Sequence, residues 1–371
     1  MVRIALLAVL LVLSGVASAD AAERRVPRGW LGVTVDGPVG ASDGREWDKM
    51  ARNGVETVRT AFSWATLQPA PGASFDFAAT DALVIAAARR GLALVPVVQS
   101  PPSWAAVQPR VFGSPPANPD DVRELFSALV GRYGPRGSLW RERTDLPRLP
   151  IRAWQVFNEP NLAVFWSVQP FERDYVATVR AAAAGIRADD PEATVVLGGL
   201  PNVSWGALAR IYAAGGRGSF DAVAIHPYSR IPRNLVRIVR YVRGVMRANG
   251  DGALPIWVTE FSWPAARAMR DVPDWAISAF GRPLTDSEQA GRLFSAVRRF
   301  LAARERLGVA RLLWYTWLSA EDPGGRDPFA YSGLRRVRDG GRRSAPALGV
   351  FRRWARRLEG CAKTTDARRC R

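Results

Sequence analysis

Short apolar segments alternate with longer helical patterns along most of the chain. Eight segments have the length and the apolar, β-branched composition of buried strands: residues 30–35, 55–62, 92–99, 151–157, 194–198, 222–226, 256–259 and 310–316. Alanine-rich or amphipathic stretches predict helices at residues 78–90, 119–133, 171–188, 234–248, 286–306 and 345–358. Strands that alternate with helices favour a parallel sheet with crossover helices.

This order predicts an α/β protein, a single-domain (β/α)8 TIM barrel over residues 30–358. No second composition class marks another domain. An open doubly wound sheet is the alternative, and it is disfavoured because no glycine-rich phosphate-binding turn follows the first strand. In a barrel the loops after the strands form the active site, so the proline-rich loops 100–118 and 264–283 are expected to shape it.

The first residues have the features of a secretory signal peptide, which is predicted over residues 1–19. A short basic start precedes an apolar run at residues 4–13, and residues 17–19 (Ala-Ser-Ala) offer a small-residue cleavage site. An uncleaved anchor is the alternative, and residues 20–29 are expected to form a loose lead-in. No later apolar run reaches about eighteen residues, so no transmembrane segment is expected after cleavage. The expected location is secreted, extracellular or in the cell envelope.

The last residues carry both cysteines, Cys361 and Cys370, in a predicted C-terminal tail at residues 359–371. In an exported protein this pair could close a small loop through a disulfide, and free thiols or bonds to other chains are the alternatives. With one histidine and two late cysteines in the sequence, a catalytic zinc site is disfavoured. The site is therefore expected to use no metal and no cofactor.

The chain has 52 Lys and Arg against 34 Asp and Glu, which gives a net charge of +18. Nearly all the positive charge is arginine, spread over the whole length, whereas a nucleic-acid protein is expected to gather it in a patch with a recognisable module. No such module is present, so nucleic acid is not expected as a partner. A genome-wide arginine bias explains the charge, and the functional alternative is electrostatic association with an anionic envelope polymer.

Two glutamates stand at the ends of predicted buried strands. Glu159 follows the fourth strand in Trp-Gln-Val-Phe-Asn-Glu-Pro-Asn, and Glu260 ends the seventh in Ile-Trp-Val-Thr-Glu-Phe. Burial disfavours a charged carboxylate, so each needs a reason, and a strand-end salt bridge is the alternative for each one alone. Closure of the barrel would bring the two to face each other across its mouth, about five ångströms apart, which is the spacing of the retaining glycosidases. One carboxyl would then be protonated to release the leaving oxygen, and the other ionised to attack the sugar.

The triplets around these glutamates, Asn158-Glu159-Pro160 and Thr259-Glu260-Phe261, resemble clan A of the glycoside hydrolases. That clan includes the cellulase-like family five and the xylosidase-like family thirty-nine, and the resemblance covers residues 30 to about 358. It implies a retaining double displacement, with Glu159 as general acid/base and Glu260 as nucleophile. It also implies that Asn158 hydrogen-bonds the 2-hydroxyl of the sugar.

Further positions fit the clan pattern. The resemblance places Arg59, on the second strand, beside the nucleophile, where its charge would favour the ionised form, with a structural ion pair as the alternative. His226 and Tyr228 end the sixth strand; Tyr228 would donate a hydrogen bond to Glu260, and His226 would lie near the acid, with a satisfied core histidine as the alternative. Trp317, after the eighth strand, would form the aromatic floor of the sugar subsite. The third strand ends in Gln-Ser where many members carry a histidine, which leaves the sugar open.

The sequence is rich in tryptophan, with fourteen. Six of them fall at or after predicted strand ends, and flat apolar faces can stack on sugar rings. Core or loop packing is the alternative for any single one. Those six are Trp64, Trp104, Trp166, Trp205, Trp263 and Trp317. Four of them are candidate substrate-binding residues: Trp64, Trp104, Trp263 and Trp317.

The sequence therefore predicts a secreted retaining β-glycoside hydrolase whose partner is a poly- or oligosaccharide. A transglycosylase with the same residues, a non-catalytic carbohydrate-binding barrel and an envelope scaffold are the alternatives. Residues 40–44 match a nucleophile-elbow pattern, but Gly37 and Pro38 precede it where a buried strand should run, so an esterase is disfavoured. The sugar, its linkage and the choice between internal and terminal cleavage remain open.

Overall fold

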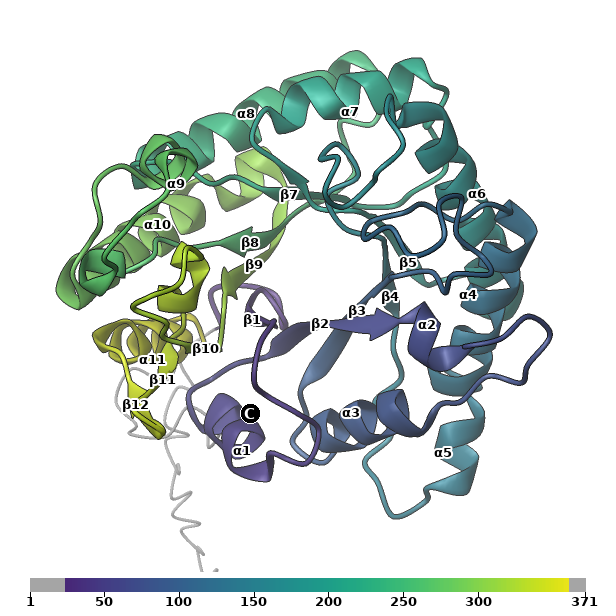
Figure 1. Cartoon of the computed structure of the whole chain (residues 1–371), viewed down its shortest axis with the longest axis horizontal. Coiled ribbons are helices and arrows are strands. Elements are labelled where there is room, and N and C mark those ends of the chain that lie inside the picture. Colours follow the sequence, from purple (N-terminus) through teal and green to yellow (C-terminus); the bar gives the residue numbers. More distant parts are fainter. Residues whose placement is uncertain (1–23, 360–371) are drawn as a thin grey trace, which may run out of the picture.

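The computed structural model describes residues 24–359, in which nine strands form one curled sheet with the order β5-β4-β3-β2-β1-β9-β8-β7-β6. All neighbouring strands pair in parallel. Figure 1 shows these strands curving around a common centre with the helices outside them. The strands are β1 (Leu31–Val35), β2 (Thr57–Ser63), β3 (Ala93–Gln99), β4 (Ala153–Val156), β5 (Thr194–Leu197), β6 (Leu200–Pro201), β7 (Val223–His226), β8 (Ile256–Phe261) and β9 (Val309–Tyr315).

All eight predicted strands are present, and the two-residue β6 is an addition that pairs with β7. The end strand β5 also contacts the segment that precedes β7. A parallel bridge joins Val196 of β5 to Ala222, the residue before β7, and the Leu197 amide donates to the Ala222 carbonyl at 3.0 Å. The predicted α/β class is thus confirmed as a curled parallel sheet flanked by helices.

The helices connect the strands and cover the outside of the sheet. Six were predicted: α3 (Ala78–Ala88), α4 (Pro119–Tyr133), α6 (Glu172–Asp189), α8 (Pro232–Ala248), α10 (Asp286–Leu307) and α11 (Pro346–Leu358). The structure adds α1 (Gly44–Arg52), α2 (Trp64–Leu67), α5 (Ser138–Glu142), α7 (Ser204–Ala213), α9 (Asp274–Phe280) and two 3₁₀ turns, η1 (Ala266–Ala268) and η2 (Pro328–Tyr331).

Local sequence signals explain where the long helices begin and end. The side chain of Asn118 accepts a hydrogen bond from the Asp120 amide at the start of α4, the predicted cap ahead of a first-turn proline. Thr285 and Glu288 form a capping box that starts α10. Gly308 ends that helix with a φ of 62°, a left-handed conformation that glycine adopts without strain.

A small second sheet, absent from the sequence prediction, lies between β9 and α11. It consists of β10 (Leu318–Ala320), β11 (Arg335–Arg338) and β12 (Gly341–Ser344). The last two strands read Arg-Arg-Val-Arg and Gly-Arg-Arg-Ser, so no apolar alternation marks them. Ion pairs anchor β11 instead: Arg335 lies 2.7 Å from Glu46 and is 4% exposed.

The main hydrophobic core packs the helices against the outer face of the sheet. A smaller, separate cluster consists of residues on or beside the strands, including Val95, Val196 and Trp257 from β3, β5 and β8. In the described part of the chain, no helix combines the length and the apolar character needed to span a membrane. The predicted signal peptide and both cysteines fall outside the described residues, and the domain boundaries stay predictions.

Candidate active site

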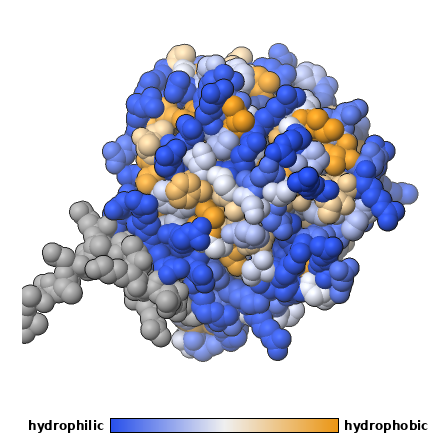
Figure 2. Space-filling model, turned by 90° about the vertical axis from the view of Figure 1, so that its left-hand side faces the viewer, coloured by the Kyte–Doolittle hydropathy of each residue, from blue (hydrophilic) through white to orange (hydrophobic). Residues whose placement is uncertain are grey.

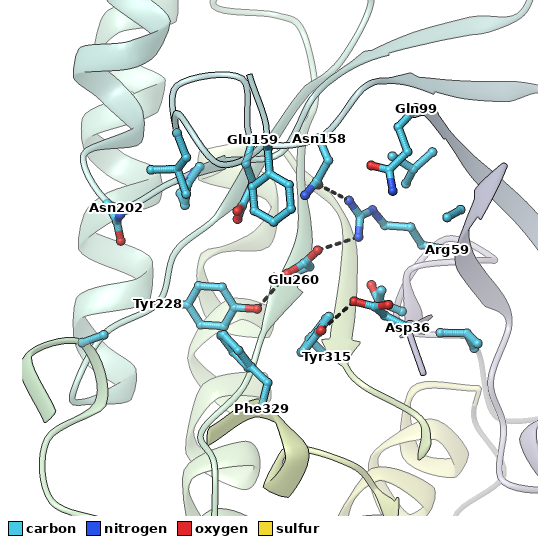
Figure 3. Close-up of a pocket in the computed structure, with 18 of the residues that line it drawn as sticks. Asp36, Arg59, Gln99, Asn158, Glu159, Asn202, Tyr228, Glu260, Tyr315 and Phe329 are labelled. Carbon is cyan, nitrogen blue, oxygen red and sulfur yellow. Dashed lines mark hydrogen bonds and ion pairs between the residues drawn. The ribbon is translucent and has the colours of Figure 1, made fainter. Parts of the chain in front are cut away.

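A cavity of about 320 Å³ opens at the carboxyl ends of the strands, the end where sites form in sheets of this kind. Strand ends supply its floor, and the segments that follow the strands supply its walls. Figure 3 shows residues from both. Lining residues from β1 to β9 and the residues just after them are Thr34, Val35, Asp36, Arg59, Thr60, Ala61, Val97, Gln99, Asn158, Glu159, Pro201, Asn202, Tyr228, Glu260 and Tyr315.

Glu159 and Glu260 face each other in this cavity. One carboxylate oxygen of each and a ring nitrogen of His226 all lie within 4.8 Å of one another. Glu159 follows β4 with a φ of 42°, in the left-handed region that side-chain-bearing residues rarely occupy. Strain of this kind gathers at functional sites, and here it belongs to the turn that carries the carboxyl. The two glutamates are 7% and 8% exposed.

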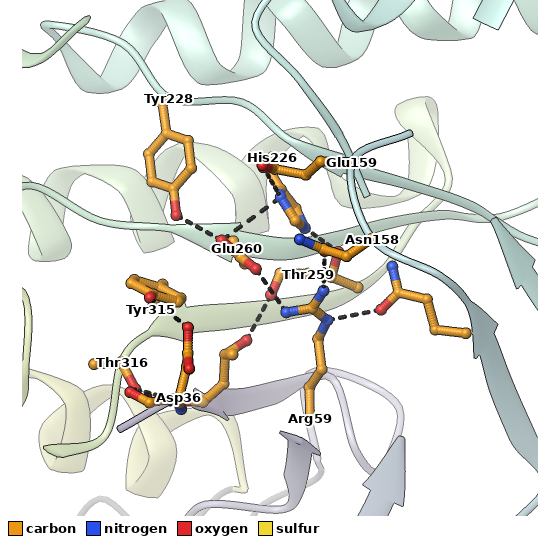
Figure 4. A network of polar contacts seen from close by, with 12 residues as sticks. Asp36, Arg59, Asn158, Glu159, His226, Tyr228, Thr259, Glu260, Tyr315 and Thr316 are labelled. Carbon is orange, nitrogen blue, oxygen red and sulfur yellow. Dashed lines mark hydrogen bonds and ion pairs between the residues drawn. The ribbon is translucent and has the colours of Figure 1, made fainter. Parts of the chain in front are cut away.

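Glu260 is held by two hydrogen-bond donors (Figure 4). Arg59 donates to its Oε1 at 2.6 Å, and the Tyr228 hydroxyl donates to its Oε2 at 2.8 Å. Arg59 also donates to Gln155 at 2.7 Å and to the side-chain oxygen of Asn158 at 2.6 Å. A buried guanidinium needs a carboxylate partner, so these contacts favour an ionised and fixed Glu260.

Glu159 has a different environment. Burial raises the pKa of its carboxyl to about 8, against the opposing effect of the Arg59 charge. Its Oε1 lies 2.6 Å from Nδ1 of His226, whose other nitrogen lies 3.0 Å from the Thr259 hydroxyl. Burial lowers the pKa of His226 to about 3, so the imidazole is neutral at pH 7. With a protonated Glu159, the buried cluster contains one cation and one anion and is neutral overall.

The space for His226 depends on a glycine. A Cβ added at Gly199, just after β5, would lie 1.9 Å from Nε2 of His226. Any side chain there would displace the imidazole from its contacts with Glu159 and Thr259. The Gly-Gly pair at this strand end was the available sequence signal, because glycine after a strand often marks a close approach.

The prediction that Trp317 forms the aromatic floor of the sugar subsite is wrong. Its indole is fully buried, does not line the cavity, and donates to Oε2 of Glu46 at 2.9 Å. Glu46 belongs to α1 and also accepts from Arg335 of the small second sheet. The indole therefore joins structural elements outside the cavity, because a buried N–H requires a partner and Glu46 provides one.

The other candidate tryptophans also lie outside the cavity lining. Trp64 and Trp263 are fully buried, and the indole of Trp263 donates to a backbone carbonyl at 2.6 Å. Trp104 is partly buried and packs edge-on against Trp64 with ring centroids 5.8 Å apart. Core packing, the alternative for each single tryptophan, therefore describes all three.

Several lining residues escaped the sequence analysis. Asp36 follows β1 directly and accepts a 2.7 Å hydrogen bond from the Tyr315 hydroxyl, and Gln99 ends β3. Their signal was a polar residue at the carboxyl end of an apolar strand. Phe329, from η2, had no comparable signal, because it reaches the cavity from the insertion that contains the second sheet.

Glu159, His226 and Glu260 are also the group among the described residues that could offer ligand atoms to a metal ion. Arg59 already occupies one carboxylate oxygen of Glu260. A divalent cation bound to these ligands would lie beside that guanidinium, so the arrangement favours acid–base chemistry over metal binding.

No protein-family sequence model and no curated protein sequence matches the chain. Solved structures do match its fold. A family 39 glycoside hydrolase from the gut symbiont Bacteroides cellulosilyticus WH2 superposes with a TM-score of 0.67 and 20% identity, over 89% of this chain and 64% of that one. A monomeric β-xylosidase from Caulobacter crescentus CB15 gives 0.64 and 19%, over 90% and 69%. An endo-β-1,4-glucanase from Xanthomonas axonopodis pv. citri gives 0.55 and 14%, over 88% and 99%. The chain is thus similar in fold to glycoside hydrolases, including family 39.

Proposed function

We propose that this protein is a retaining β-glycoside hydrolase built on one closed (β/α)8 barrel, with Glu159 as acid/base and Glu260 as nucleophile. The observation that carries the proposal is the pair of buried carboxyls, with oxygens within 4.8 Å, in environments that favour opposite protonation states. Retaining glycosidases hold their carboxyls about 5–5.5 Å apart, whereas inverting enzymes need about 6.5–9.5 Å to admit a water.

In the first step, an oxygen of Glu260 attacks the anomeric carbon as the bond from that carbon to the glycosidic oxygen breaks. The proton of Glu159 passes to the departing oxygen, so the leaving group departs as a neutral alcohol. The products are a glycosyl ester on Glu260 and an ionised Glu159. The 2.8 Å hydrogen bond from Tyr228 and the Arg59 contact hold the attacking carboxylate in one orientation.

In the second step, Glu159 takes a proton from a water molecule, and the water oxygen attacks the anomeric carbon. The ester bond breaks and returns the electron pair to Glu260, which regains its contact with Arg59. Two inversions give net retention at the anomeric carbon. Both glutamates are then back in their starting states.

His226 orients the acid in this scheme. In the productive arrangement its Nδ1–H donates to Oε1 of Glu159, and the acidic proton sits on Oε2, free to reach the leaving oxygen. Nε2 then accepts from the Thr259 hydroxyl, 3.0 Å away. The 2.6 Å contact between Nδ1 and Oε1 supports this role, since it fixes which carboxyl oxygen turns to the substrate.

The sugar would be bound mainly from β1 to β4. Arg59 occupies the side-chain oxygen of Asn158, so the amide group of Asn158 remains to donate to the 2-hydroxyl. Asp36 and Gln99 line the same cavity and offer acceptors and donors for further hydroxyls. A non-catalytic carbohydrate-binding barrel is disfavoured because such binding does not require two carboxyls in opposed environments. The proposal also includes secretion and association with anionic envelope polymers, and the support for both comes from the sequence alone.

The test uses the mature protein with a panel of aryl β-glycosides and β-linked oligosaccharides. Glu260→Ala should lower kcat/KM at least about a thousandfold. Glu159→Gln should lower it by about 10²–10⁴-fold on substrates with poor leaving groups. Glu305→Gln, which removes an exposed carboxylate on α10, is the matched control and should keep full activity.

The anomeric form of the first product, followed by proton NMR, tests retention. Inverted product would contradict Glu260 as nucleophile. Transfer of the sugar to an added alcohol or saccharide in preference to water would favour the transglycosylase. Tight sugar binding without turnover of any substrate would favour the non-catalytic barrel.

A further inference from the structure

The cavity has a polar side and an apolar side. Figure 3 places Asp36, Arg59 and Gln99 to one side of Glu260, with Tyr228 and Asn202 on the other. The polar group comes from β1, β2 and β3. On the other side, β6 and the segments after β4 and β8 contribute mostly apolar lining residues, namely Leu162, Phe165, Pro201, Trp275, Ala279 and Phe280.

The apolar side is where the leaving group would depart. Leu162 and Phe165 belong to the same turn as the acid, and the Leu162 amide donates to the Glu159 carbonyl at 2.9 Å. The acid gives its proton to the glycosidic oxygen, so the group attached to that oxygen lies next to this turn. The sugar that reacts with Glu260 lies towards the polar side.

Aromatic rings form one continuous wall from the nucleophile outwards. The Tyr228 ring lies 5.5 Å from Phe280 and 5.4 Å from Phe329, measured between centroids. Trp275 lies 6.4 Å from Phe280 and is 51% exposed. On the turn after β4, Phe165 lies 6.1 Å from Phe112, measured between centroids, and Phe112 is 70% exposed. The apolar lining therefore continues from the cavity to the protein surface.

The exposed apolar side chains gather at this end of the molecule. The surface face in Figure 2 is mostly hydrophilic, with separate apolar patches, as expected for a chain with this much arginine. Of the nine large apolar side chains exposed in residues 24–359, seven lie in the loops after β3, β4 and β6 or in the segment 262–283 after β8, which includes α9, whereas Tyr241 and Phe294 lie on the long helices α8 and α10. The seven are Val107, Val111, Phe112, Val164, Val203, Trp275 and Ile277.

We propose that the natural substrates carry an apolar aglycone, an alkyl or aromatic group, in place of a further sugar. The inference rests on the proposed glycosidase function. A second sugar in the aglycone position would bury hydroxyl groups against Leu162, Phe165 and Phe280, with few partners to replace their water. An alkyl or aromatic group would instead bury apolar area against the same side chains.

The test compares alkyl β-glycosides of one sugar that the enzyme cleaves, with methyl, butyl and octyl aglycones. These alcohols have similar acidity, so the series changes apolar contact and leaves the chemistry of the leaving group nearly constant. Each buried methylene should raise kcat/KM by up to about fourfold. The benzyl and hexyl glycosides then distinguish an aromatic from an alkyl aglycone, and the disaccharide of the same sugar provides a polar aglycone.

Phe165→Ala and Trp275→Ala should reduce the dependence of kcat/KM on chain length. Phe294→Ala removes an exposed aromatic ring on α10 and is the matched control that should retain it. Thermal melts verify that the variants fold. A disaccharide cleaved as well as the butyl glycoside, or a chain-length dependence that both cavity variants leave intact, would overturn the proposal.

Failure to cleave any glycoside would refute the proposed hydrolase function but would not test the proposed apolar aglycone site. In that case calorimetric titration with octyl β-glucoside, octyl β-xyloside and octyl β-mannoside decides. The wild type should bind at least one octyl glycoside more tightly than its methyl counterpart, and Trp275→Ala should lose that difference. Equal affinity for octyl and methyl glycosides would reject the apolar site.

Discussion

Replacing Glu159 by glutamine keeps the shape of the side chain and removes its ability to ionise, which makes the energetic effect of its burial measurable. Burial raises the pKa of this carboxyl from 4.5 to about 8. In the unfolded chain the carboxyl titrates at its ordinary pKa. Between pH 4.5 and 8, therefore, the folded protein holds a proton that the unfolded chain has released, and rising pH favours unfolding.

The magnitude follows from proton linkage. Because the folded state holds one extra proton in this window, each rise of one pH unit lowers the free energy of unfolding by roughly 1.4 kcal/mol. From pH 4.5 to pH 8 the loss amounts to roughly 5 kcal/mol. Below pH 4.5 both states are protonated, and above pH 8 both are ionised, so the effect of Glu159 on the slope vanishes outside the window.

The assay is urea unfolding of the wild type and Glu159→Gln between pH 5 and pH 9. Other titrating groups are common to both proteins, so the difference in unfolding free energy isolates Glu159 and the groups that it contacts. Glu159→Gln should gain stability relative to the wild type as the pH rises to 8, and the difference should then level off. The kcat/KM of the wild type should fall above pH 8 because the acid loses its proton. Parallel stability curves for the two proteins would refute a raised pKa.

Three other substitutions test separate parts of the site. Tyr228→Phe removes the 2.8 Å hydrogen bond to Glu260 and should lower kcat about 10–100-fold with a smaller effect on KM, measured by steady-state kinetics. Gly199→Ala places a Cβ 1.9 Å from His226 and should cost about 1–3 kcal/mol in urea unfolding and most of the activity; a variant as stable and active as the wild type would contradict the packing. Trp317→Phe should lower stability by about 1–3 kcal/mol through loss of a buried hydrogen bond and leave KM unchanged, whereas a large rise in KM would restore Trp317 to the substrate site.

The strands and the catalytic candidates were predictable because both follow from burial. A strand buried on both faces must be an almost continuous apolar run, and such runs stand out in a sequence. Glu159 and Glu260 stand out in the sequence for the same reason, since a carboxyl at the end of an apolar strand is unusual. Gln155 has the same signal: it is polar, fully buried, and was passed over, although it holds Arg59 through a 2.7 Å contact.

The walls of the cavity were not predictable in the same way. The sequence does not indicate whether the ring of a tryptophan at a strand end packs into the core or lines the cavity. Trp64 and Trp317 both pack into the core. Trp275 was overlooked because it lies in α9, inside a segment that the sequence describes only as a proline-rich loop. Phe329 depends on a sheet held by arginine ion pairs, which hydrophobic patterns do not reveal.

The charges of the buried cluster suggest how one glutamate can act first as an acid and then as a base. Before reaction, Arg59 is balanced by Glu260, and Glu159 is protonated. Once Glu260 is esterified, the guanidinium has lost its carboxylate, and its charge already favours the ionised form of Glu159. We therefore expect the pKa of Glu159 to fall in the glycosyl-enzyme, because the same cation then has one anion left to stabilise. A dinitrophenyl glycoside, whose leaving group needs no acid, isolates the second step. Its turnover should stay fast well below pH 8, and a second step that requires pH above 8 would contradict this transfer of charge.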